Sequence, residues 1–242
     1  MLKFLLSRIE ALECRAAVKE VAEKCFALAH VVLYRVPFGP RCPVCGALEV
    51  SVYRPVVGEE LARQWGLSPE WIAHFNGREG RICVACGSSL RVKQLARVLL
   101  GHFADVSNRR WDSVHEAVQS GLLPPFKIAE INSCGALHKF LAGHAYLSYS
   151  EFEPSDARIQ HENFMALSYP SESFDIVLHS DTLEHVPDLG RALGELWRVL
   201  KPGGVSVFSV PIVRDGRATV ERARLEEEQV VHLMEPSYHG GS

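Results

Sequence analysis

The chain has 242 residues, 47% of them hydrophobic, and a formal net charge of −3. These values allow one medium-sized domain with a sizeable core and, in addition, a small module. Residues 1–121 carry a net charge of +4 and the remaining residues −7, which predicts two units with different surfaces. Because the basic residues form no cluster, the charge does not indicate nucleic acid as a partner.

Residues 1–36 have the pattern of an amphipathic helix. Leu5, Ile9 and Leu12 recur near helical spacing, with charged residues between them. We expect this helix to pack on the rest of the protein or on a second copy in a homodimer. The alternative, a helix lying on a membrane surface, is disfavoured by the four glutamates among the first 23 residues.

The N-terminal segment does not have the form of a secretory signal peptide, because Arg8, Glu10 and Glu13 interrupt any apolar run. The most apolar later stretch, residues 25–34, is far shorter than the roughly 20 residues that span a bilayer. We therefore expect a soluble, cytoplasmic protein with no membrane span. In that setting, seven cysteines, four of them in two pairs, favour metal binding over disulfides.

Residues 37–121 contain two Cys-x-x-Cys pairs, "CPVCG" and "CVACG", with short helical patterns between and after them. Two such turns bring four thiolates to one ion, and soft ligands in fourfold coordination favour zinc. The glycine after each pair fits the tight turn that this geometry needs. We predict a small module folded around structural zinc, with the ligands Cys42, Cys45, Cys83 and Cys86. The alternatives are a thiol redox pair and unconnected reduced cysteines.

Residues 122–242 change to short strand-like runs, among them "FKIAEI", "HAYLSY", "FDIVLHS" and "GVSVFSVPIV". Helical or loop segments separate these runs, so the pattern predicts an α/β fold with a mostly parallel sheet. After Pro211, "RDGRATVERARLEEEQ" has a helical or irregular pattern, and "VVHLMEP" has that of one short strand. We interpret this end as a natural truncation or as the end of a fragment.

The most specific segment is "SFDIVLHSDTLEHVPDLGRALGELWRVLKPGGVSVFSVP". Its strand "DIVLH" ends in polar residues at the carboxyl edge, where ligands of open α/β sheets bind. Asp188 then caps a helix that "KPGG" ends. The arrangement resembles the class I S-adenosylmethionine-dependent methyltransferases, in particular those with "LEHV" after the fourth strand and "RVLKPGG" before the fifth. The paired cysteines followed by "GSSLRVKQLA" resemble bacterial members with a zinc-binding N-terminal region.

This resemblance implies a Rossmann-like domain over residues 122–242 that binds S-adenosylmethionine and whose C-terminal hairpin is missing or shortened. It places the methionine part over the loop that begins at Glu130, the ribose at Glu151, the adenine beside Asn163 and the sulfonium near His179. The full set of cofactor-binding residues that it implies is Glu130, Asn132, Ser133, Gly135, Glu151, Asn163, Phe164, His179 and Ser180.

The loop "EINSCGALH" departs from the glycine-rich pattern of this family at Asn132 and Ser133. After glycine, asparagine is among the residues that best tolerate a left-handed backbone. Asn132 can therefore hold the turn, while its amide bonds either the carboxylate of the cofactor or the loop itself. We expect a modified loop that still binds the cofactor.

The resemblance further implies methyl transfer to a small-molecule or sugar-containing acceptor by in-line displacement. Asp181 and His185 follow the fourth strand and are the candidate catalytic residues, although Asp181 alternatively caps the next turn. Two other hypotheses stay open. One is an RNA methyltransferase whose zinc module grips RNA, and the other is a non-catalytic protein that acts by binding a partner.

Overall fold

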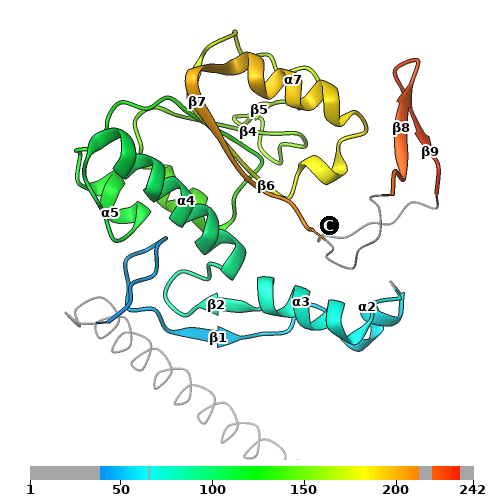
Figure 1. Cartoon of the computed structure of the whole chain (residues 1–242), viewed down its shortest axis with the longest axis horizontal. Coiled ribbons are helices and arrows are strands. Elements are labelled where there is room, and N and C mark those ends of the chain that lie inside the picture. Colours follow the sequence, from blue (N-terminus) through cyan, green and yellow to red (C-terminus); the bar gives the residue numbers. More distant parts are fainter. Residues whose placement is uncertain (1–38, 65, 213–219, 235–242) are drawn as a thin grey trace, which may run out of the picture.

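The computed structural model describes residues 39–64, 66–212 and 220–234 (Figure 1). The helix predicted over residues 1–36 lies outside this part of the chain. Among the helices that are described, none is long and apolar enough to cross a membrane.

The cysteine module is built from a small antiparallel sheet and two short helices. Strand β1 (Ser51–Tyr53) pairs with β2 (Arg81–Cys83), and helices α2 (Glu59–Gln64) and α3 (Pro69–Glu79) lie between them in the sequence. Helix α3 begins at Pro69: Ser68 is the N-cap and accepts a hydrogen bond from the Trp71 backbone N–H, and the proline occupies the first turn.

Two further helices, α4 (Leu90–Ser107) and α5 (Val114–Gln119), follow the second cysteine pair. The apolar face of α4 buries Leu95, Leu99 and Phe103, and this helix packs against strand β7 and helix α6 of the following domain. One hydrophobic cluster consequently runs from the cysteines into the sheet. The boundary between residues 121 and 122 stays a prediction, because the helix on its N-terminal side shares a core with the sheet.

The main sheet has five parallel strands in the order β5-β4-β3-β6-β7, which confirms the α/β fold. The strands are β3 (Ile128–Ile131), β4 (Leu147–Glu151), β5 (Gln160–His161), β6 (Phe174–Ser180) and β7 (Leu200–Ser209), and the helices between them are α6 (Ala136–Leu141), the 3-10 turn η1 (Leu183–His185) and α7 (Leu189–Val199). Since all the strands are parallel, their carboxyl ends meet at one edge, which is where such sheets bind ligands. Figure 1 shows α4 and α7 on opposite sides of this sheet.

The C-terminal hairpin differs from the prediction. Strands β8 (Ala223–Glu226) and β9 (Gln229–His232) form an antiparallel hairpin; β8 lies where the sequence predicts a helical or irregular segment, whereas β9 overlaps the short strand predicted in "VVHLMEP". The turn residues Glu227 and Glu228 have φ values of 47° and 64°, and two left-handed residues make the mirror-image turn that suits two-residue hairpins. A shortened hairpin is therefore present, but it forms a sheet of its own and does not extend the main sheet.

Candidate functional site

The four predicted zinc ligands converge. Their sulfur atoms all lie within 4.8 Å of one another, with Cys42 Sγ 3.9 Å from Cys86 Sγ and Cys45 Sγ 4.0 Å from Cys83 Sγ. Tetrahedral zinc with bonds of about 2.3 Å separates its sulfur ligands by about 3.8 Å. The donor set and its spacing thus fit a structural zinc ion, and the meeting of all four sulfurs favours this over an isolated redox pair.

Each cysteine pair sits in the same tight turn. Gly46 and Gly87 have φ values of 77° and 76°, and their backbone N–H groups donate to the carbonyls of Cys42 and Cys83 at 2.9 and 2.8 Å. A side chain at either position would strain this left-handed backbone. Cys83 is the last residue of β2, so the second cysteine turn is attached directly to the small sheet. Helix α3 precedes β2 in the sequence.

Glu130 lies inside β3 and is fully buried. One of its carboxylate oxygens accepts the Cys134 backbone N–H at 2.8 Å, and the other is 2.7 Å from Nδ1 of His138. This hydrogen bond raises the pKa of His138. One oxygen is therefore bonded to the loop and the other to helix α6, so Glu130 fixes the conformation of the loop.

The modified loop keeps the expected turn. Asn132 adopts a left-handed φ of 59°, and its side-chain oxygen accepts the Phe152 backbone N–H at 2.9 Å. This bond ties the end of β3 to the end of β4. Gly135, with φ 63° and ψ −130°, occupies a backbone region that is nearly exclusive to glycine. Ser133 Oγ accepts the Gly135 backbone N–H at 3.2 Å.

Glu151 is the last residue of β4 and is half-buried. It accepts a hydrogen bond from the Tyr149 hydroxyl, and the Tyr149 ring lies 4.1 Å from the ring of His138. Burial, followed by the bond to Glu151, raises the pKa of Tyr149. Two hydrogen bonds and one ring contact thus connect Glu130 with Glu151, the two acidic residues that the sequence singles out. His138 and Tyr149 were missed because only tertiary packing brings them between these carboxylates.

A cavity of about 780 Å³ opens at the carboxyl edge of the sheet and is bordered by the hairpin residues Val230 and His232. The predicted site residues that line it are Asn132, Asn163, Phe164, Asp181 and His185. The predicted residues outside its lining are Glu130, Ser133, Gly135, Glu151, His179 and Ser180. The structure thus brings together about half of the predicted set, while the others support the walls or lie beside them.

Phe164 and His179 pack on each other beneath this cavity. Their ring centroids are 5.0 Å apart in an edge-to-face arrangement, and the other face of His179 stacks on Phe208. His179 is fully buried, and within the described part of the chain neither ring nitrogen has a hydrogen-bond partner. Burial lowers the pKa of His179 to about 4. This residue is thus a neutral core histidine and does not border the cavity. Nearby, Asn163 accepts the Met165 backbone N–H at 2.9 Å.

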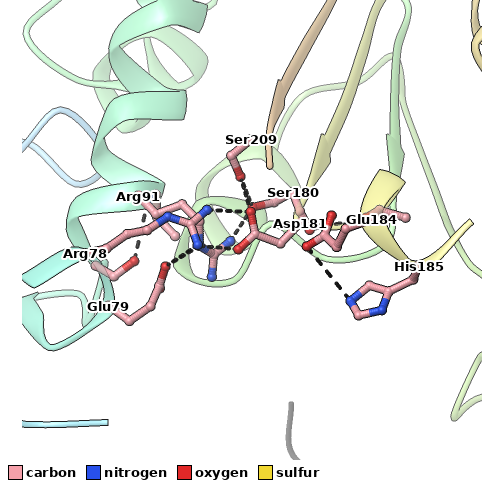
Figure 2. A network of polar contacts seen from close by, with 11 residues as sticks. Arg78, Glu79, Arg91, Ser180, Asp181, Glu184, His185 and Ser209 are labelled. Atoms are coloured by element: carbon pink, nitrogen blue, oxygen red, sulfur yellow. Dashed lines mark hydrogen bonds and ion pairs between the residues drawn. The ribbon is translucent and has the colours of Figure 1, made fainter. Parts of the chain in front are cut away.

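Asp181 is the centre of a network that joins the two units (Figure 2). Its carboxylate accepts hydrogen bonds from Arg78 at 2.5 Å and from Ser209 Oγ at 2.8 Å, and Nε of Arg91 is 3.3 Å away. Burial opposes the charge on Asp181, but these partners outweigh it and hold the pKa below its ordinary value. Arg91 also donates to Ser180.

The two candidate catalytic residues therefore differ in kind. Asp181 is a paired carboxylate with a lowered pKa, which makes it a weak base at neutral pH. The His185 side chain is half exposed, lines the cavity and lies 3.9 Å from a carboxylate oxygen of Glu184. Of the two, His185 is better placed to take up a proton from a bound molecule.

Parts of the chain are similar to known proteins. Residues 142–208 match the family described as a methyltransferase domain. The chain is 29% identical over 124 residues to a sterol 24-C-methyltransferase of Neurospora crassa, covering 50% of this chain and 24% of that protein. It is 40% identical over 70 residues to the 2-methyl-6-phytyl-1,4-hydroquinone methyltransferase of Synechocystis, covering 28% and 22%. A crystal structure of an S-adenosylmethionine-dependent methyltransferase from Mesorhizobium loti aligns at 25% identity and a TM-score of 0.29, covering 40% of this chain and 52% of that one.

The fold and the cavity define an α/β protein of the type that binds a nucleotide-like cofactor at the carboxyl edge of its sheet. The match to the methyltransferase domain covers residues 142–208, the part of this sheet from just before β4 to within β7. The matches span about a quarter of the length of the two curated relatives named above.

Proposed function

We propose that this protein transfers a methyl group from S-adenosylmethionine to a small-molecule acceptor. The observation that carries the proposal is the cavity at the carboxyl edge of the sheet, lined by Asn132, Asn163 and Asp181, in a domain of the methyltransferase family. The names of the two curated relatives mention small molecules, a sterol and a hydroquinone, which supports a small-molecule acceptor.

Residues in the lining of the cavity and beside it fit this cofactor in their chemistry. Glu151, at the end of β4, offers carboxylate oxygens to ribose hydroxyls, and Asn163 offers an amide to the base edge. The loop from Asn132 to Gly135 would lie beneath the methionine part, with the backbone N–H groups of Asn132, Cys134 and Gly135 bonded within the protein. When bound, S-adenosylmethionine would supply a methyl group activated by a positively charged sulfur, the leaving group for an acceptor's lone pair.

His185 is our candidate for the group that receives the proton of the acceptor, because it lines the cavity and histidine is the commonest general base. Asp181 has a different role in this proposal. Its paired carboxylate fixes the end of β6 and holds Arg78 and Arg91 at this edge of the sheet. In this proposal a structural zinc ion stabilises the cysteine module, which carries Arg78.

Calorimetric titration of the zinc-loaded protein with S-adenosylmethionine and S-adenosylhomocysteine tests the proposal. We expect micromolar binding of both. Glu151→Ala should weaken both affinities about tenfold, because hydrogen bonds to a charged group contribute about 1.5–3 kcal/mol. The matched control is Glu153→Ala, two residues away on the surface, which should change nothing.

Absence of binding in a cooperatively folded, zinc-loaded sample would refute the proposal and favour a role in binding a partner. An RNA methyltransferase would instead show RNA binding that falls steeply with salt concentration.

A further inference from the structure

A second cavity, of about 820 Å³, lies between helices α3 and α4 and the end of strand β7. Its walls come from both units of the chain: α3 contributes Arg78, the first residue of β2 is Arg81, α4 contributes Arg91, and β7 contributes Phe208. The cysteine module therefore forms one side of a cavity whose other side is the methyltransferase domain.

The charge of this second cavity is positive. Three arginines, Arg78, Arg81 and Arg91, line it, and its lining contains no acidic residue. Arg78 and Arg91 are paired with Asp181 and Glu79. Arg81 is exposed, and among the described residues it has no ion-pair partner. One positive charge is thus available to an anionic group.

The remaining wall is apolar and open to solvent. Leu90, Val98, Phe208 and Ile212 all line the cavity, and each is between 38% and 60% exposed. Large apolar side chains gathered around one cavity at this exposure mark a binding site for an apolar body. Together with Arg81, they match a molecule that carries one anionic group on an apolar frame.

Asp181 forms the partition between the two cavities. It lines the proposed cofactor cavity, while Arg78 and Ser209, which bond its carboxylate at 2.5 and 2.8 Å, both line the second one. A molecule in the second cavity would therefore lie next to the end of β6, on the side opposite the cofactor. Because methyl transfer needs the acceptor in contact with the donor, this position is not that of the methyl acceptor.

We propose that the second cavity is a binding site for an apolar molecule with a single carboxylate or phosphate group. The site stands on the cavity alone and does not depend on the proposed function. In this arrangement the cysteine module determines the affinity for the ligand through Arg81, which lies two residues before the predicted zinc ligand Cys83.

The test uses two fluorophores that share their aromatic frame. 8-Anilinonaphthalene-1-sulfonate has one anionic group, and N-phenyl-1-naphthylamine lacks it. Fluorescence titration of the full-length, zinc-loaded protein should show tighter binding of the anionic probe. Arg81→Gln should weaken the affinity for the anionic probe about fivefold, as expected for loss of a surface ion pair, and should change the affinity for the neutral probe less than about twofold. Gln94→Glu adds a negative charge at an exposed lining position, so it should also weaken the affinity for the anionic probe and spare that for the neutral probe.

Arg110→Gln is the matched control, because Arg110 is exposed and does not line the cavity; it should leave both affinities unchanged. Saturation with S-adenosylhomocysteine should not displace the anionic probe. The inference is overturned if the probe fails to bind, if the ligand displaces it, or if Arg81→Gln affects both probes equally. A protein that binds the anionic probe as expected but not S-adenosylmethionine overturns the proposed function and leaves this inference standing.

Discussion

The guanidinium of Arg78 donates a hydrogen bond to the carboxylate of Asp181 at 2.5 Å, across 103 positions of the sequence. Arg78 is near the end of α3 in the cysteine module, and Asp181 directly follows β6 at the carboxyl edge of the sheet. Both side chains are mostly buried, with 16% and 22% of their surfaces exposed. The pair therefore connects the module to the edge of the candidate site.

Arg78→Gln should lower the free energy of unfolding by about 1–3 kcal/mol, because it leaves a poorly solvated carboxylate without its main partner. Urea unfolding at pH 7 measures this difference. The control is Arg63→Gln, whose partner Glu60 and own side chain are both exposed; here the change should stay within about 0.5 kcal/mol. Equal effects of the two substitutions would mean that the pair with Asp181 does not hold the units together.

Cys83→Ser should abolish binding of about one zinc ion per chain and lower the melting temperature by on the order of 10 °C, since metal binding supplies folding free energy to a small module. Zinc content by mass spectrometry and thermal unfolding are the measurements. Cys134→Ala is the control: this buried cysteine lies outside the four-cysteine cluster, so zinc content should stay the same. Unchanged zinc in Cys83→Ser would refute the site.

Gly135→Ala should destabilise the protein by about 1–3 kcal/mol and weaken cofactor binding, because alanine fits poorly at φ 63° and ψ −130°. Gly101→Ala is the control for this substitution. Gly101 lies inside α4 with open space around it, and alanine there should stabilise the helix by up to about 1 kcal/mol. Denaturant unfolding and calorimetry of both variants separate the two cases. A neutral Gly135→Ala would show that the loop does not need this backbone geometry.

The His138–Glu130 pair should make stability depend on pH. Its hydrogen bond to Glu130 raises the pKa of folded His138 above the ordinary value of 6.5. The stabilising contribution is therefore complete below pH 6.5 and is lost as the pH rises through the folded pKa. The difference in unfolding free energy between wild type and His138→Gln should be larger at pH 6 than at pH 9. A difference independent of pH would show that His138 contributes only packing.

Local patterns were sufficient for much of this protein. The cysteine spacing and the following glycines predicted both metal-binding turns, since a tight turn depends on residues that are neighbours in the chain. Short strand-like runs predicted the parallel strands, and a helix cap predicted the helix after Asp188. Asn132 was expected in the left-handed turn that it adopts. The hairpin at Glu227 and Glu228 was missed, because two glutamates are an uncommon choice for a turn of left-handed residues.

Tertiary structure decided the state of the candidate residues. Arg78 neutralises Asp181, His138 occupies an oxygen of Glu130, and two aromatic rings enclose His179. None of these pairs is visible in a periodic pattern, because periodicity reports which face of one element is buried and not which element covers it. The sequence alone determined the two cysteine turns and the strands of the main sheet, which depend on residues close together in the chain. The packing of the cysteine module against the sheet determined the charge of Asp181 and created the second cavity, because both depend on side chains far apart in the chain.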